Sequence, residues 1–350
     1  MRNASEPDQV PAFVRELLDA ALAAGASDIY WLPSETEVAV RFRVNGQQIP
    51  HCVVAGDVGR QCLTHVKVLA KLLTYRTHIA QDGVIRMDQV ELRVATMPTL
   101  FGERITMRVM NKSQPPIGLG DLGFDPECLE HLRGLLKKPT GLLLLTGPTG
   151  SGKTTTIYAM IRELIANQQD PASIISLEDP VESVIPGISQ ASVGRQSEQE
   201  DWGYAAGLKA ALRHDVKTLV VGELRDASVA KIALDAALTG HRVITTYHAG
   251  DIASVFARLL HQGFEPFLVA SAISGVVAQR LARSSDGHVQ PIIALLESSD
   301  GWRDFICGAP SLEAIRARVA TEPLGDLRTA AERFVDAGTL SRELAEFASQ

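Results

Sequence analysis

The 350-residue sequence predicts an α/β protein in which a small α/β module, built on an antiparallel sheet, precedes a larger domain with a parallel sheet. Apolar residues alternate with a period of two in the first part, whereas apolar strands and helical segments take turns after residue 124. Residues 147–154 fit the phosphate-binding pattern G-x-x-x-x-G-K-[ST]. We therefore expect four regions: residues 1–111, a linker at 112–123, a nucleotide-binding core at 124–283 and a C-terminal appendage at 284–350.

The first region carries signals for two helices and at least three strands. Apolar residues at helical spacing predict helices at 12–24 and 58–73. Strict alternation predicts strands at 38–44, 90–97 and 105–110. Asn45-Gly46 directly follows the first strand and is a tight-turn signal, so a β-hairpin is expected there.

The same alternation places arginines on one face of the predicted sheet. If Val40 and Phe42 point inward, Arg41 and Arg43 point to the opposite face. Arg93 and Arg108 follow the same rule on their own strands. Two interpretations stay open: a solvated polar face, or a set of arginines that meets the phosphates of a neighbouring nucleotide site.

Composition marks the linker, and the alternation of strands with helices marks the core. Residues 112–123 contain Pro115, Pro116, Gly118, Gly120 and Gly123, which is typical of an interdomain connection. Beyond it, apolar runs at 142–145, 173–177, 219–221 and 243–246 predict parallel strands joined by crossover helices. The helix at 227–238 has Asp226 as an expected N-cap and is followed by Gly240.

Residues 147–154 join an apolar strand to the amphipathic helix 155–165, and this context disfavours a chance match by a glycine-rich turn. Glycines let backbone N–H groups turn toward phosphate oxygens, and a helix N-terminus favours negative charge. Lys153 can reach the outer phosphates, and the Thr154 hydroxyl can hold Mg²⁺. We expect a nucleoside triphosphate to be bound by Gly147, Pro148, Thr149, Gly150, Ser151, Gly152, Lys153, Thr154 and Thr155.

Two acidic residues and one histidine are expected at the carboxyl edge of the parallel sheet. Glu178 and Glu223 each end an apolar strand, where ligands of open parallel sheets bind. Glu182 and Asp226 fit turn and cap positions instead. His248 ends the strand at 243–246 on the same edge. His241 lies at the opposite end of that strand, so the two histidines are not expected to share a metal.

Composition excludes several classes of protein. A net charge of −7 offers no global attraction to nucleic acid or anionic lipid. The four cysteines are scattered, which predicts neither a zinc cluster nor a disulfide framework and fits a reducing cytosol. No signal peptide is expected. Residues 268–282 are too short and too polar to span a bilayer.

Four segments in order resemble the secretion and pilus-assembly ATPases of the type II secretion and type IV pilus superfamily. They are the Walker A run 147–154, the aspartate box 176–182, the Walker B run 219–226 and the histidine box 239–248. The resemblance extends from Ala26 to Leu281. Stretches at 40–46, 81–83 and 92–98 resemble the assembly and secretion branch more than the retraction branch. The four-cysteine zinc module that many such members carry after the position of Arg283 has no counterpart here.

The resemblance implies a RecA-like P-loop domain behind a PAS-like N-terminal domain, in a homohexamer that hydrolyses ATP with Mg²⁺. It implies that Lys153 and Thr154 contact nucleotide and metal, that Glu178 activates water and that Glu223 holds metal or water. His248 would lie near the phosphates. Arginines at the positions of Arg93, Arg104 and Arg108 would complete the site when the hexamer closes.

The implied partner is an inner-membrane platform protein, with the chain cytoplasmic, peripheral at the membrane through that partner and not inserted in it. Pilus retraction or conjugative transfer by the same family stays open as an alternative. A DNA translocase is disfavoured because the chain is acidic and lacks aromatic residues interleaved with basic ones. A nucleotide-binding switch without rapid hydrolysis is disfavoured because both Glu178 and Glu223 are present.

Overall fold

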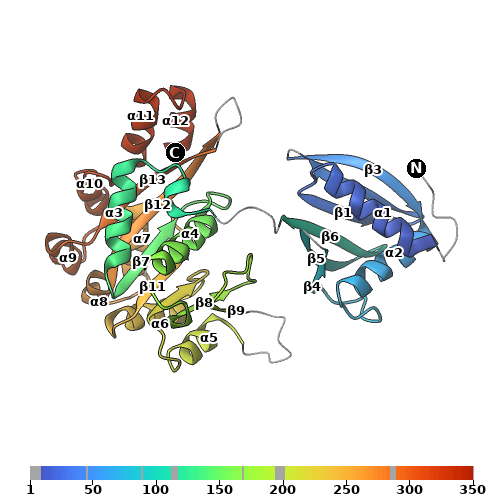
Figure 1. The fold of residues 1–350 in the computed structure, drawn as a ribbon, viewed down its shortest axis with the longest axis horizontal. Coiled ribbons are helices and arrows are strands. Elements are labelled where there is room, and N and C mark those ends of the chain that lie inside the picture. Colours follow the sequence, from blue (N-terminus) through green and yellow to red (C-terminus); the bar gives the residue numbers. More distant parts are fainter. Residues whose placement is uncertain are drawn as a thin grey trace. The chain divides into compact units, whose positions relative to one another are not determined.

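The computed structural model describes residues 9–44, 46–87, 90–111, 117–167, 169–193, 202–283 and 289–349. Within it the chain forms two compact units, Met1–Pro115 and Pro116–Gln350 (Figure 1). Asn45 of the predicted turn and residues 112–116 of the predicted linker lie outside the described residues. The boundaries of the four regions expected from the sequence stay predictions.

The first unit is a six-stranded antiparallel sheet with two helices on one face. Its strand order is β3-β2-β1-β6-β5-β4. The strands are β1 (Asp28–Pro33), β2 (Glu37–Val44), β3 (Gln47–Ala55), β4 (Gln81–Arg86), β5 (Val90–Thr99) and β6 (Gly102–Asn111). The helices α1 (Val10–Ala23) and α2 (Gly56–Leu69) share one apolar core with the inward side chains of these strands.

The predicted alternation in this sheet is confirmed. Val40 and Phe42 are buried against the helices, and Arg41 between them is exposed. On β6, Ile105 and Met107 belong to the same core, so Arg104 and Arg108 lie on the opposite face. The arginines therefore gather on the face that the helices leave uncovered.

A buried ion pair fastens α2 to the sheet. The Lys67 Nζ lies 2.8 Å from both carboxylate oxygens of Glu103 and also donates to the Arg76 carbonyl at 2.9 Å. Only 1% of Lys67 and 8% of Glu103 is exposed. Each charge is thus compensated inside the fold by the other.

The second unit is built on a seven-stranded sheet in the order β13-β12-β7-β11-β10-β8-β9. All neighbours are parallel except the pair of β13 with β12. The strands are β7 (Gly141–Thr146), β8 (Ile174–Glu178), β9 (Ser189–Ser192), β10 (Thr218–Val221), β11 (Arg242–Tyr247), β12 (Ile273–Arg283) and β13 (Val289–Glu297). The predicted parallel sheet is confirmed, and β13 joins it at one edge.

Helices cover both faces of this sheet, as Figure 1 shows. One apolar core lies under α3 (Pro126–Lys137) and α4 (Lys153–Ala166). A larger core on the other face lies under eight helices. These are α5 (Tyr204–Ala211), α6 (Ala227–Leu238), α7 (Ile252–His261), α8 (Pro266–Ala272), α9 (Asp300–Cys307), α10 (Leu312–Val319), α11 (Leu327–Asp336) and α12 (Arg342–Ser349).

The start of helix α6 is capped by the residue that the sequence predicts. Asp226 accepts a hydrogen bond from the Val229 N–H at 2.9 Å, which confirms the predicted N-cap of α6.

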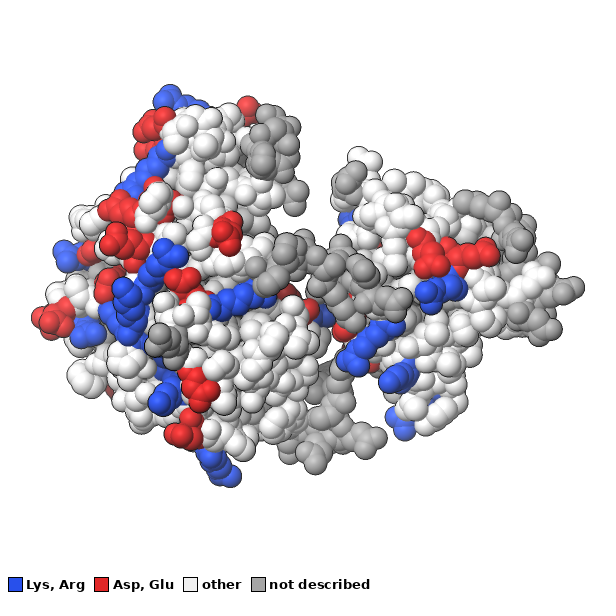
Figure 2. All heavy atoms as spheres, in the orientation of Figure 1, with Lys and Arg blue, Asp and Glu red and all other residues white. Residues whose placement is uncertain are grey.

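Figure 2 shows basic and acidic side chains interspersed on the visible face of residues 116–350. In the described part of the chain, no helix has both the length and the apolar character needed to cross a bilayer.

Candidate nucleotide-binding site

The loop between β7 and α4 has the backbone of a phosphate cradle. Gly147, Gly150 and Gly152 have φ angles of 145°, 81° and 85°, which side chains rarely allow. A Cβ atom on Gly147 would lie 2.3 Å from the Gln279 carbonyl oxygen, so only glycine fits there. No side chain caps the start of α4, which leaves its first N–H groups for an anion.

Lys153 is folded back onto this loop. Its Nζ donates to the carbonyls of Gly147 and Pro148, each at 2.8 Å. Burial lowers the pKa of Lys153; the Glu223 carboxylate opposes that shift and Arg280 adds to it. A partly desolvated ammonium beside open N–H groups suits a bound phosphate, whose charge would compensate it.

The hydroxyl groups of the loop and of the first turn also fit a nucleotide. The Ser151 Oγ is buried and has no hydrogen-bond partner in the described residues. Thr154 is half-buried, while Thr155 is exposed. The Thr154 hydroxyl and the Glu223 carboxylate offer hard oxygen ligands, the kind that Mg²⁺ takes together with phosphate oxygens. The residues present therefore fit a magnesium–nucleotide complex.

Two residues of β12 near the site were missed by the sequence reasoning, and one of them, Gln279, braces the phosphate loop. Gln279 is 2% exposed; its Nε2 donates to the Ser151 carbonyl at 2.7 Å and its Oε1 accepts from the Thr156 hydroxyl at 2.9 Å. Arg280 donates to the Gly250 carbonyl at 2.7 Å, and burial lowers the pKa of its guanidinium. Both follow Ala278, which pairs with Thr146 at the end of β7.

A chain of ion pairs lies at the carboxyl edge of the sheet. The Glu223 carboxylate lies 2.9 Å from the His248 Nε2 and 3.3 Å from the Arg225 Nε. Arg225 also contacts Asp179 at 2.8 Å. The structure thus brings Glu223 and His248 together, as the sequence predicted. Asp179 and Arg225 lie in the aspartate box and the Walker B run, and the sequence does not predict their ion pair.

Glu178 is engaged in a different network. It ends β8 and is 6% exposed. One carboxylate oxygen accepts from the Ser176 hydroxyl at 2.7 Å and from the Gln190 amide at 3.1 Å, and the other accepts from the Tyr158 hydroxyl. Burial raises the pKa of Tyr158, and the bond to Glu178 adds to that shift. A water-activating role for Glu178 stays a prediction.

The remaining predicted residues have partners within their own units. A ring nitrogen of His241 lies 3.1 Å from the Ala236 carbonyl, at the opposite end of β11 from His248. Arg93 and Arg108 belong to the first unit, where they are directly paired across β5 and β6. The Arg108 Nε lies 3.1 Å from a carboxylate oxygen of the buried Asp28.

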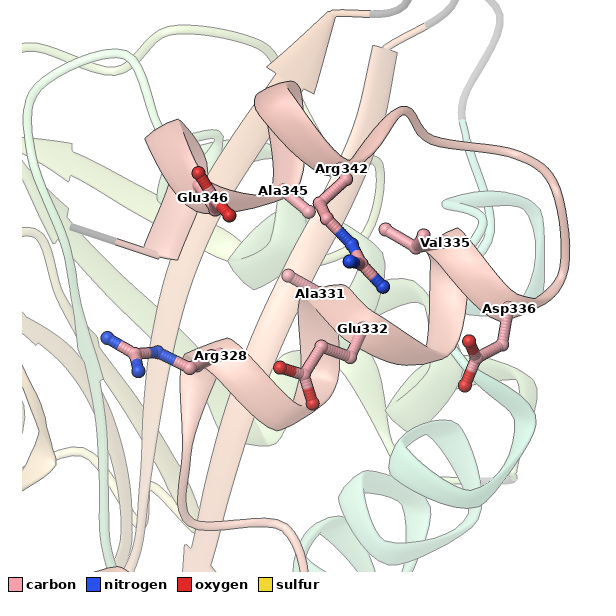
Figure 3. Close-up of a pocket in the computed structure, with 8 residues that line it drawn as sticks. All are labelled: Arg328, Ala331, Glu332, Val335, Asp336, Arg342, Ala345 and Glu346. Atoms are coloured by element: carbon pink, nitrogen blue, oxygen red, sulfur yellow. The ribbon is translucent and has the colours of Figure 1, made fainter.

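A separate hollow of about 700 Å³ lies between α11 and α12 (Figure 3). Its polar lining is mixed in charge and comprises Arg328, Glu332, Asp336, Arg342 and Glu346. The residues that line this hollow include neither a glycine loop nor a lysine, and acidic side chains outnumber basic ones. The loop 147–154 therefore remains the candidate site.

Known proteins resemble this chain along nearly its whole length. The family model described as "Type II/IV secretion system protein" matches residues 3–342. The type II secretion system protein HxcR of Pseudomonas aeruginosa is 37% identical over 96% of this chain and 70% of its own length. The type IV pilus assembly ATPase PilB of Thermus thermophilus is 38% identical over 79% of this chain, which spans only 31% of PilB.

A solved structure supports the fold. The pilus retraction motor PilT with bound ADP has a TM-score of 0.74 and 25% identity, over 95% of this chain and 96% of its own. The predicted fold class, a RecA-like α/β domain with a parallel sheet behind a smaller α/β domain, is confirmed.

Proposed function

This chain belongs to the type II/IV secretion system protein family, and on that basis we propose that it is a Mg²⁺-dependent ATPase that powers pilus assembly or protein secretion. The observation that carries the proposal is the phosphate loop with its Lys153, whose ammonium interacts electrostatically with Glu223, while His248 contacts that carboxylate at 2.9 Å. A phosphate-binding cation and an ionised carboxylate so placed suit the hydrolysis of a phosphoanhydride.

Each residue has a proposed task. The N–H groups of residues 147–154 and the Lys153 ammonium bind the phosphates, and the Thr154 hydroxyl and Glu223 hold Mg²⁺, which would neutralise developing charge on the phosphate oxygens. Glu223 orients the attacking water, and His248 keeps that carboxylate in place. Glu178 is retained as a candidate to activate water, although its hydrogen bonds also suit a supporting role.

The uncovered arginine face supports a homohexamer. Arg93 and Arg108 lie side by side on it, and Arg104 lies on the same face of β6. We assign Arg93 and Arg108 to the nucleotide site of an adjacent copy, where guanidinium groups stabilise transition-state charge. Repeated closing and reopening of the first unit over the nucleotide site of the adjacent copy would supply the mechanical motion of the motor.

The partner of this motor would be an inner-membrane platform protein, which would hold the chain at the cytoplasmic side of the membrane. Identity to HxcR and PilB exceeds identity to PilT, which favours secretion or assembly over retraction. No nucleic-acid substrate is proposed.

The test is ATP hydrolysis by the purified full chain with Mg²⁺, beside Lys153→Ala. We expect steady turnover that the substitution reduces by about 100-fold or more, because the outer phosphates lose their cation. Equal rates from both proteins would overturn the proposal.

A further inference from the structure

The Tyr158 hydroxyl uses its full hydrogen-bonding capacity inside the second unit. Tyr158 lies on α4, the helix that begins at Lys153, and is 6% exposed. Its oxygen accepts the backbone N–H groups of Glu182 at 3.1 Å and Ser183 at 3.2 Å, and its proton is donated to Glu178. One donor and two acceptor sites are all that a phenol offers.

Gln190 of β9 holds the same segment from the other side. Its Oε1 accepts from the Ile185 N–H at 2.6 Å, and its Nε2 donates to the Ser183 carbonyl at 2.9 Å and to Glu178 at 3.1 Å. Residues 179–185 form no regular helix or strand. Tyr158 and Gln190 therefore hold the backbone of this segment, together with the buried Ile185 and a hydrogen bond from the Val181 N–H to Ser192.

This segment leads directly to the candidate catalytic groups. Asp179 at its start forms an ion pair with Arg225, and Arg225 contacts Glu223. Helix α4 thus begins with Lys153, which belongs to the phosphate loop, and it holds segment 179–185 through Tyr158.

We propose that Tyr158 is a positioning residue, which aligns segment 179–185, and through Asp179 and Arg225 the Glu223 carboxylate, with the phosphate loop. The inference rests on the proposed ATPase function. Tyr158 touches no substrate in this account. Removing its hydroxyl takes away the acceptor of the Glu182 and Ser183 N–H groups and one of the three hydrogen bonds that Glu178 accepts, so the segment shifts while the loop 147–154 keeps its own contacts.

The experiment compares the full-length chain with Tyr158→Phe. The matched control is Tyr204→Phe, because Tyr204 is also buried and its ring lies 5.5 Å from the Arg225 guanidinium carbon, a contact that phenylalanine keeps. We expect Tyr158→Phe to lower kcat by about 10- to 100-fold, as small misplacements of reacting groups do. KM and equilibrium affinity for ATP should stay within about twofold. Amides of residues 182 and 183 should exchange hydrogen faster, and Tyr204→Phe should match the wild type.

The outcomes separate the inference from the proposed function. Wild-type kcat in Tyr158→Phe, or a loss of ATP affinity equal to the loss of kcat, would overturn the inference and leave the ATPase intact. An inactive wild type would sink the proposed function, while unchanged exchange at 182 and 183 would independently refute the anchoring role. Should Tyr158→Phe fail to fold, Gln190→Ala removes the other anchor and must show the same split between kcat and KM.

Discussion

We propose Glu223 as the central residue of the reaction, because its carboxylate contacts His248 and Arg225 and interacts electrostatically with Lys153. Glu223 is about a quarter exposed, whereas Arg225 and His248 are about half exposed, so solvent screens these pairs in part. This placement makes Glu223 the clearest target for substitution.

Glu223→Gln keeps the shape of the side chain and removes its charge. We expect kcat to fall by about 100-fold or more with ATP binding retained, because orientation of water is lost while the phosphate loop stays intact. The control is Glu297→Gln, which removes a carboxylate paired with Lys138 at the opposite edge of the sheet. Steady-state kinetics and ATP titration measure both, and normal turnover in Glu223→Gln contradicts the assignment.

The cysteines give a prediction about reaction with thiol reagents. Burial raises the pKa of Cys62 to about 11 and of Cys128 to about 12, whereas Cys307 is exposed. At about pH 8 the two buried groups are therefore neutral thiols, and a thiol reagent should modify Cys307 first, with Cys62 and Cys128 following only on unfolding. Cys307→Ser should remove the fast phase. Rapid modification of either buried cysteine in that variant would show the core to be open.

At the candidate site, the sequence predicted which residues lie at one edge of the sheet but not all of their contacts. The pairing of Glu223 with His248 followed from strand ends on one edge of a parallel sheet. The setting of Glu178 did not, because its partners Tyr158 and Gln190 come from α4 and β9. One signal was available: Ser176 and Glu178 have the same parity on β8 and so point to the same face of the sheet.

Among the elements, the strand–loop–helix around β7 depends on one glycine. At Gly147 a Cβ would meet the Gln279 carbonyl at 2.3 Å, and φ is 145°. Gly147→Ala should cost about 1–3 kcal/mol of unfolding free energy from backbone strain, and should also abolish ATP binding. In contrast, a Cβ on the exposed Gly134 of α3 meets nothing within 4 Å, so Gly134→Ala should stabilise the protein by about 0.5–1 kcal/mol. Urea titration measures both, and equal effects would contradict this geometry.

The join between α2 and β6 rests on the buried pair of Lys67 and Glu103. Lys67→Met should lower the unfolding free energy by about 3–5 kcal/mol, because Glu103 is left charged and buried. The double variant Lys67→Met with Glu103→Met should recover most of that loss. Urea unfolding followed by circular dichroism tests this, and a double variant less stable than the single one would contradict it.

Elements with a strong period were predictable, and those without one were not. The alternating strands of the first unit and the apolar runs of β7, β8, β10 and β11 all appear in the structure. Strand β12 was missed because Ser274, Gly275 and Gln279 interrupt its apolar run. Strand β9 is short, polar and at the edge of the sheet, so neither composition nor period marks it.

At the scale of the whole molecule, we propose that each of the two units carries half of a catalytic arrangement. The second unit holds the phosphate loop with Glu223, and the first holds the arginine face. In the first unit Asp28 pairs with both Arg43 and Arg108, which keeps these guanidinium groups ordered on the uncovered face. Hydrolysis in the proposed ring therefore needs residues from two copies of the chain.

The mixing of two inactive variants measures this requirement most directly. Glu223→Gln retains the arginines, and the double variant Arg93→Ala with Arg108→Ala retains the phosphate loop and Glu223. Each alone should be nearly inactive while still binding ATP. Mixed in equal amounts and allowed to exchange subunits, they should recover roughly a quarter of wild-type turnover, because one neighbour supplies what the other lacks across a head-to-tail interface. A mixture as inactive as its components, or full activity of the arginine variant alone, would contradict the central claim.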